Sequence, residues 1–189
     1  MTVKINYLSK TISKSSSNLV LFSNEKFNIS SLKKNLSDSE FSYINDLLKS
    51  SDLKKKILVF EVNSKKKIVL ISIKPNLKLS DLENLGAEFY KSINYGKGGE
   101  YFLNTDSVNN KYVNFIGHFL HGLMLKSYEF TKYKTKKEKR VISINVVGGK
   151  NKPSFQNQLK FKALEEGTFY ARDLVSEPGN ILHPDEYAK

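Results

Sequence analysis

The order of hydrophobic and polar positions along the chain predicts alternating strands and helices. Alternation of apolar and polar residues, or a short run of β-branched residues between polar turns, is typical of a strand. Segments of this kind occur at 3–7, 18–22, 56–62, 66–73, 100–105 and 140–147. The polar turn between 56–62 and 66–73 predicts a hairpin. The segment 140–147 is apolar on both faces, so we expect a central strand covered by helices on both sides.

Apolar residues at three- and four-residue spacing predict helices at about 38–50, 80–93, 112–130 and 154–175. Two of them begin with a capping-box pattern, Ser37 with Glu40 and Ser80 with Glu83. In the third helix, Val113 is expected on the buried stripe with Ile116. The stripe of the last helix contains small residues that would allow another element to approach closely: Phe155, Leu159, Ala163, Gly167, Ala171 and Leu174.

The interleaving of strands and helices favours an α/β fold with a mixed sheet between helical layers. A length of 189 residues suits one sizeable domain with a short annex. We expect a domain over 1–150 and a linker helix over 151–189, divided near the break at 148–153. No apolar run approaches the ~18 residues of a membrane helix, and the N-terminus lacks a signal-peptide segment. These features predict a cytoplasmic protein without a membrane partner.

The formal charge of +12 raises the hypothesis of a nucleic-acid partner. However, Arg140 and Arg172 are the only arginines among 31 basic residues, and specific phosphate sites favour the planar guanidinium of arginine. The densest basic run, 132–140, either contacts DNA or RNA or is a solvated loop between a helix and a strand, and its position favours the loop. The candidate contacts are Lys132, Lys134, Lys136, Lys137, Lys139 and Arg140.

Other candidate sites have simpler structural explanations. Residues 104–107 (NTDS) could begin a metal-binding loop, but a turn accounts for them. His118 and His121 share a helix face, yet HExxH spacing is absent and surface or interface positions are favoured. The glycine-rich segment 94–100 could hold phosphate or could end a helix. The chain has no cysteine, which excludes disulfides and thiolate sites.

The C-terminal segment ARDLVSEPGNILHPDEYA (171–188) resembles the junction of the leucyl (cytosol) aminopeptidase family, where a long helix enters the catalytic domain. The family pattern is A-R-D-L-V-N-x-P-x-N-x-x-x-P, and Ser176 stands where asparagine is usual. The segment GLMLKSYEFTKYKT (122–135) resembles the family's G-x-x-L-x-x-Y-x-F-x-x-Y-K segment near the end of the N-terminal domain. The resemblance covers most of 80–189. Residues 1–75 agree only in the order of elements.

This resemblance implies a macro-domain-like N-terminal domain followed by the linker helix. Family members carry two divalent metals, zinc or manganese, in a C-terminal catalytic domain and assemble as hexamers. None of their catalytic or metal-binding residues can be carried onto this chain, and NTDS lacks the glutamate and arginine of the family's N-T-D-A-E-G-R-L signature. The implied partners are the catalytic domain and sister subunits, a peptide substrate through the larger enzyme, and DNA, which some bacterial members bind.

The leading hypothesis is therefore a non-catalytic N-terminal domain of a metal-dependent leucyl aminopeptidase that is inactive by itself. The alternative is a basic α/β binding module for DNA, RNA or a nucleotide. The nucleotide version depends on the glycine-rich segment and on analogy of fold.

Overall fold

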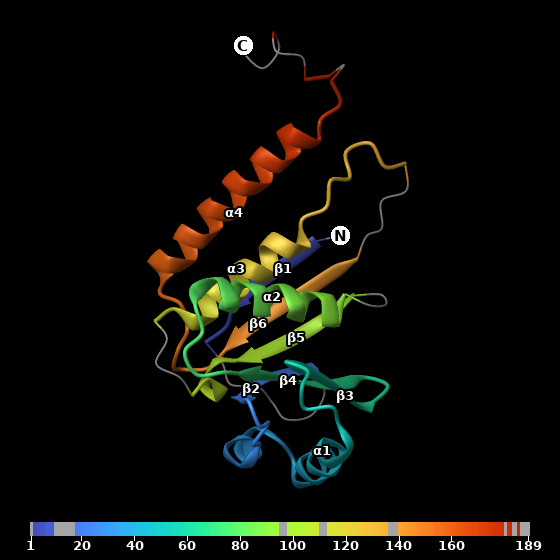
Figure 1. Cartoon of the computed structure of the whole chain (residues 1–189), viewed down its shortest axis with the longest axis vertical. Helices are drawn as coiled ribbons and strands as arrows, with labels where there is room; N and C mark the ends of the chain where they lie inside the picture. Colours follow the sequence, from blue (N-terminus) through green and yellow to red (C-terminus); the bar gives the residue numbers. More distant parts are fainter. Residues whose placement is uncertain are drawn as a thin grey trace.

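A computed structural model describes residues 2–9, 18–94, 98–109, 113–135, 140–179, 181–182 and 185. Its strands are β1 (Thr2–Tyr7), β2 (Asn18–Asn24), β3 (Ile57–Asn63), β4 (Lys66–Ile73), β5 (Gly98–Asn104) and β6 (Val141–Val147). Its helices are η1 (Ser30–Asn35), α1 (Asp38–Ser50), α2 (Leu79–Ile93), η2 (Thr105–Ser107), α3 (Phe115–Ser127) and α4 (Phe155–Ser176). Figure 1 shows their arrangement.

The strands form one six-stranded sheet in the order β1-β6-β5-β2-β4-β3. All neighbouring pairs are parallel except β3 and β4, which form the hairpin expected from the sequence. Because β2, β4 and β5 run in the same direction, their C-terminal ends meet at one edge of the sheet. The predicted mixed α/β fold is confirmed.

Helices α2 and α3 cover one face of the sheet (Figure 1). Phe22 of β2 packs edge-on against Phe115 and Phe119 of α3, with ring centroids 5.3 Å apart in both pairs. The two helices touch almost backbone to backbone. A Cβ added to Gly86 would lie 1.8 Å from the carbonyl oxygen of Phe119, and one added to Gly122 would lie 1.9 Å from that of Glu83. Only glycine allows such close packing at these two positions.

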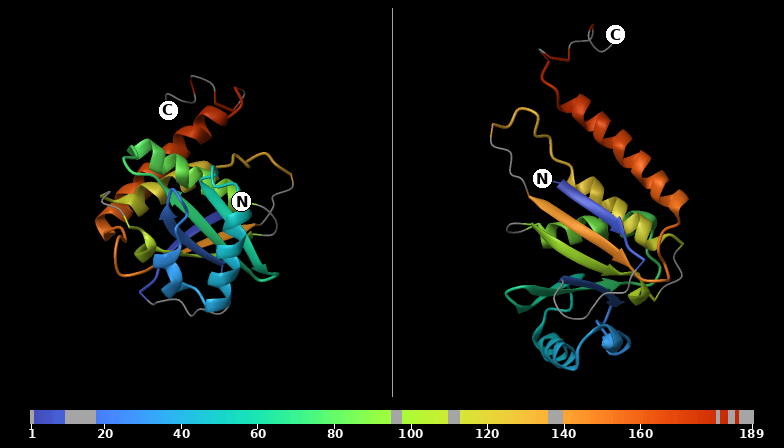
Figure 2. Two further views of the ribbon diagram at one scale, coloured as in Figure 1. Left: turned by 60° about the horizontal axis from the view of Figure 1, so that its bottom comes forward. Right: turned by 180° about the vertical axis from the view of Figure 1, so that it is seen from behind.

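The opposite face of β2, β4 and β3 is covered by η1 and α1 (Figure 2). The predicted capping box begins α1, because Ser37 Oγ accepts a hydrogen bond from the Glu40 amide and Glu40 Oε2 accepts one from the Ser37 amide. Glu40 also forms an ion pair of 2.6 Å with Lys66 of β4, and both side chains are buried. This pair ties α1 to the sheet beneath it.

Three predictions about element boundaries and faces are wrong. Helix α2 begins at Leu79, and its first turn is closed by Asp81, which accepts from the Lys78 amide, instead of by Ser80 and Glu83. Helix α3 begins only at Phe115. Val113 therefore lies outside the helix and is 86% exposed.

The prediction that β6 is apolar on both faces is also wrong. Ile142 and Ile144 join the core beneath α2 and α3. The opposite face carries Ser143 and the buried Asn145, whose side chain accepts a hydrogen bond from Asn6 and donates one to Glu100. A polar network on β1, β6 and β5 thus replaces the second hydrophobic layer expected there.

Helix α4 packs along α3 and extends past the sheet, with its C-terminal end farthest from the body (Figures 1 and 2). Phe161 is its buried residue. None of the helices in the described part of the chain is long and apolar enough to cross a membrane.

Candidate functional site

The two segments that resemble aminopeptidase motifs lie against each other in the structure. Arg172 of α4 donates from Nη1 to the carbonyl oxygen of Leu125, at the end of α3, over 2.7 Å. Its guanidinium also lies over the ring of Tyr128, 5.4 Å from the centroid. One arginine therefore both satisfies a carbonyl in the last turn of α3 and stacks on the aromatic residue that follows it.

Tyr128 makes two further contacts with α4. Its hydroxyl donates to Asp173 over 2.7 Å, and its ring packs against Phe169 at 5.3 Å between centroids. Burial and the hydrogen bond to Asp173 raise the pKa of Tyr128 above its usual value.

Glu177, just after α4, binds the C-terminal end of the segment 125–133. Its carboxylate accepts from Lys132 Nζ over 2.5 Å and from the Tyr133 hydroxyl. These two donors lower the pKa of Glu177, and the shared hydrogen bonds raise the pKa of Lys132 and of Tyr133. Hydrogen bonds and a surface ion pair therefore hold 125–133 along the C-terminal half of α4.

A more deeply buried contact joins the N-terminal half of α4 to α3. The ring of Phe161 lies between His118 and His121, with centroids 5.0 and 5.2 Å away. It also fills the space above Gly117, where an added Cβ would lie 2.4 Å from the Phe161 ring. Phe161 is the apolar anchor of the helix.

The two histidines pair with different carboxylates. His118 Nδ1 lies 3.0 Å from Glu83 of α2, and His121 Nδ1 lies 3.1 Å from Glu165 of α4. Across the described residues, no three histidine, cysteine, aspartate or glutamate side chains gather as metal ligands would. Of the two positions predicted for these histidines, surface or interface, the structure shows the interface between α3 and its neighbouring helices, and their arrangement does not fit a metal ion.

Residues 104–107 form the predicted turn. Asn104 Oδ1 accepts from the Asp106 amide at the start of η2. The Asp106 carboxylate in turn accepts from the amides of Gly149 and Lys150, which lie after β6. The aspartate is used to join two loops of the fold.

The glycine-rich segment lies partly outside the described residues, since 95–97 are not described. Helix α2 ends at Ile93, and Gly98, in the left-handed region with φ of 90°, begins β5. The described part therefore lies at the N-terminal end of β5, opposite the edge at which the C-terminal ends of the parallel strands meet.

The predicted nucleic-acid contacts are only partly described. Lys132 pairs with Glu177, and Lys134 pairs with Glu129. Arg140 precedes β6, and its carbonyl oxygen accepts from the Thr2 amide. Lys136, Lys137 and Lys139 lie outside the described residues. A nucleic-acid contact in this run stays a prediction.

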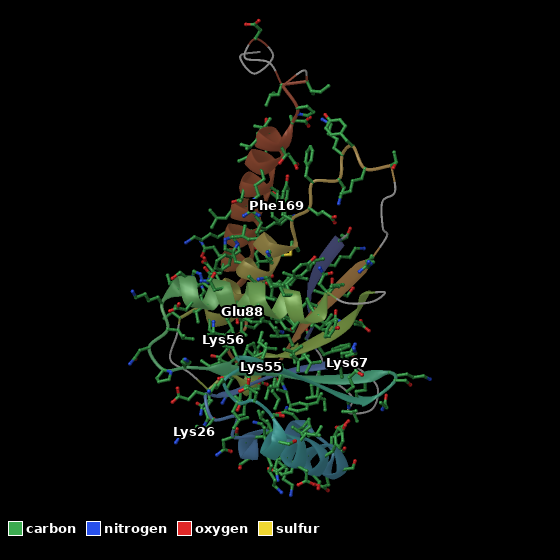
Figure 3. The ribbon with its side chains drawn as sticks, turned by 45° about the vertical axis from the view of Figure 1, so that its right-hand side comes forward. Lys26, Lys55, Lys56, Lys67, Glu88 and Phe169 are labelled. Carbon is green, nitrogen blue, oxygen red and sulfur yellow. The ribbon has the colours of Figure 1, made fainter. Side chains whose placement is uncertain are left out.

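Other lysines are spread over the surface instead of forming one stripe. Figure 3 labels Lys26 after β2, Lys56 before β3 and Lys67 on β4, which come from separate parts of the fold. Lys56 pairs with Glu88 of α2 over 2.7 Å, and Lys67 pairs with Glu61 of β3 over 2.6 Å. Part of the positive charge is thus neutralised within the chain.

The small-residue stripe predicted on α4 faces away from the body. Its members Phe155 and Leu159 are 73% and 50% exposed, and no atom lies within 4 Å of a Cβ built on Gly167. Further along the helix, Tyr170 and Val175 are also exposed. We call this surface the outer face of α4: Phe155, Leu159, Ala163, Leu164, Gly167, Tyr170, Ala171 and Val175.

The sequence analysis identified the small-residue stripe of α4 as a surface that another element could approach, but it did not identify the side packed on α3 and missed Phe161, Arg172 and Tyr128 as contact residues. The spacing of Phe161, Glu165 and Phe169 at four-residue intervals is the signal that marks the packed side. It was hidden because the opposite stripe is longer and more apolar.

No protein-family profile matches the chain. It is 33% identical over 132 residues to a protein of Clostridium perfringens named "Probable cytosol aminopeptidase", a match that covers 65% of this chain and 27% of that protein. A protein of the same name from Ehrlichia ruminantium is 36% identical over 112 residues, which are 56% of this chain and 21% of that protein. The chain thus spans about a quarter of the length of these relatives.

Solved structures show the same fold. A tomato leucine aminopeptidase mutant superimposes with a TM-score of 0.70 at 15% identity, over 97% of this chain and 40% of that one. A cytosol aminopeptidase from Coxiella burnetii gives a TM-score of 0.60 at 15% identity, over 95% of this chain and 35% of that one. The bottromycin maturation enzyme BotP in complex with Mn gives 0.64 at 12% identity, over 92% and 35%. Together, sequence and fold relate this chain to the leucyl (cytosol) aminopeptidases, whose N-terminal domain it matches.

Proposed function

We propose that this chain is the non-catalytic N-terminal domain and linker helix of a metal-dependent leucyl aminopeptidase of the cytoplasm. The larger enzyme would remove N-terminal residues from peptides. The sequence relatives support this proposal, because the chain matches only about a quarter of each.

The observation that carries the proposal is the outer face of α4. Large apolar side chains such as Phe155 and Val175 are exposed along a helix whose other side is already packed on α3. An exposed apolar surface of this kind marks a site of interaction. We propose that it contacts the catalytic region that the relatives possess beyond the matched part.

In this proposal the two parts of the chain have different roles, because one side of α4 packs on the domain and the other is exposed. Residues 1–150 would form the macro-like α/β domain, and 151–189 would connect it to the catalytic region. Arg172, Tyr128 and Glu177 would fix the direction in which the connection leaves the domain. In this proposal the role of the junction is positional.

The metals belong, in this proposal, to the catalytic region. One solved neighbour, the bottromycin maturation enzyme BotP, forms a complex with Mn, and a divalent ion can polarise a carbonyl and activate a bound water molecule. We infer that two zinc or manganese ions are bound there by residues beyond the matched part. Assembly into a hexamer would likewise take place through the catalytic regions.

The test is hydrolysis of leucine amide by the purified 189-residue chain in the presence of Mn²⁺ or Zn²⁺. We expect no turnover above that of a sample treated with a metal chelator. Metal-dependent turnover by this chain alone would contradict the assignment of the chemistry to another region.

A further inference from the structure

A crevice lies at the edge of the sheet where the C-terminal ends of β2 and β4 meet. Its volume is about 660 Å³, which is the size of a pocket for a small ligand. It is lined by the ends of both strands, by the loops that follow them and by residues just after β5, including Ser107. It is separate from the α4 junction, and the inference drawn from it does not depend on the proposed function.

The position of the crevice is the one that strand order favours for a ligand. From β2 the chain passes to the edge strand β3 and returns to β4 beside β2 on one side, and it then crosses over to add β5 and β6 on the other side. In open sheets with parallel strands, ligands bind outside the C-terminal ends of the strands at the point where the order reverses. Here that point is the end of β2.

The lining has an apolar floor and a polar rim. Ile73, which is 9% exposed, contributes a small apolar surface, whereas the ring of Phe22 is packed in the core. The rim consists mainly of serine and asparagine side chains. Asn24 and Asn28 use their Oδ1 atoms to accept backbone amides within the loop after β2. Their Nδ2 groups, which have no hydrogen-bond partner among the described residues, are left as donors.

The charge of the lining is positive. Lys74, directly after β4, is exposed at the rim, and its ammonium forms no ion pair with any residue that the structure describes. None of the described residues that line the crevice is acidic. A cation beside amide and hydroxyl groups, with no carboxylate among them, suits an anionic ligand such as a phosphate group.

The loop between β2 and η1 is also held in an unusual backbone conformation. Phe27 has a φ of 51°, in the left-handed region that bulky residues rarely adopt. Its side chain is nevertheless buried in the core beneath α1, and this burial offsets the backbone cost. The buried Phe27 side chain thus anchors the loop that carries Asn24 and Asn28.

We propose that this crevice binds a phosphorylated ligand of nucleotide size. Lys74 would hold the phosphate, Asn24 and Asn28 would donate hydrogen bonds to polar groups of the ligand, and Ile73 would contact its apolar part. The sequence-based nucleotide hypothesis relied on residues 94–100. The crevice lies instead at the C-terminal ends of the strands.

The test is isothermal titration calorimetry of the 189-residue chain with ADP, adenosine and inorganic phosphate as probes. We expect ADP to bind with a Kd on the order of 10–100 µM and to bind at least about tenfold more tightly than adenosine or phosphate. The variant Lys74→Ala should weaken ADP binding by about tenfold or more, because a charge-assisted contact is lost. Ser31→Trp, at an exposed position in the lining, should occlude the crevice and abolish binding.

Lys65→Ala is the matched control, since Lys65 is an exposed lysine in the turn between β3 and β4 at the other edge of the sheet. It should leave the ADP affinity unchanged. The proposal is overturned if ~1 mM ADP gives no heat, or if phosphate alone binds as tightly as ADP. It is also overturned if ADP binds equally well to the Lys74→Ala and Ser31→Trp variants.

Discussion

Helices α3 and α4 pack in different ways, although each contains apolar residues at helical spacing. The apolar residues of α3 are buried between α2 and the sheet, and Gly122 allows backbone contact with α2. Helix α4 is attached through Phe161 and a row of polar contacts, while its longer apolar face is exposed. The buried residues of α3 thus contact α2 and the sheet within this chain, whereas the exposed face of α4 is the surface that we propose contacts the catalytic region.

The largest contrast is expected from adding the same methyl group to a glycine in each helix. Gly122→Ala should lower the free energy of unfolding by more than about 3 kcal/mol, because the Cβ would collide with the backbone of α2. Gly167→Ala meets no neighbouring atom and should raise it by up to about 1 kcal/mol through helix propensity. Urea unfolding measures both. Equal effects would contradict the difference in packing.

The next effect concerns the attachment of α4. Phe161→Ala removes the buried anchor and should cost about 2–3 kcal/mol. Hydrogen exchange should show faster exchange of α4 amides while α2 and α3 stay protected. Phe155→Ala, on the outer face of α4, is the control and should change neither quantity. Loss of protection throughout the sheet would show that α4 is an integral part of the core.

A smaller effect separates the buried ion pair of the body from the surface ion pair of α4. Glu40→Gln should cost about 2 kcal/mol, because a buried lysine loses its charged partner. Burial tends to raise the pKa of Glu40, but the hydrogen bonds from Lys66 and Ser37 outweigh it, so the pKa lies below its usual value. Glu177→Gln should have a smaller effect on unfolding, since its partner Lys132 is more than half exposed and can be solvated by water when the pair is lost.

The pH dependence of this pair has a definite sign. Because the pKa of Glu40 is lower in the folded state, the unfolded state binds more protons at acidic pH. The stabilisation should be complete above the usual carboxyl pKa and should decline as the pH falls through the lowered value. Urea unfolding between about pH 3 and 7 should therefore show a steeper loss for the wild type than for Glu40→Gln. Parallel curves would contradict the role of the pair.

The smallest effect on the chain itself is expected at the outer face of α4. Leu159→Asp replaces a half-exposed residue and should change the free energy of unfolding by less than about 0.5 kcal/mol. Its effect should appear only in a larger enzyme, as weaker contact with the catalytic region. A large destabilisation of the 189-residue chain would show that this face is already packed.

Local patterns predicted most of the elements, because the interactions that form them are local. The Ser37–Glu40 box begins α1, and Leu82 and Phe89 face the core as expected. The predicted helix 112–130 begins too early, because Asn114 is in the left-handed region with φ of 59° and α3 can begin only after it. A periodic pattern does not reveal such a backbone conformation.

Less of the candidate site than of the fold could be predicted from the sequence. Its motif segments were identified, but Arg172 meets Leu125 across 47 residues of chain, and no local pattern reports so distant a pairing. The outer face of α4 was predicted as a stripe that another element could approach, but periodicity shows that a face is apolar without showing what covers it, so the side packed on α3 was missed. The crevice was missed because it is formed by loop residues without a periodic signal.

The most direct test of the central claim is to express the complete product of the gene that encodes this chain, with and without Leu159→Asp. Both forms are assayed for hydrolysis of leucine amide with Mn²⁺. Our account predicts a longer protein that is active, and a variant with reduced activity whose N-terminal domain unfolds like the wild type. A product that is no longer than this chain, or a longer one whose activity is unaffected by a charge on the outer face of α4, would contradict it.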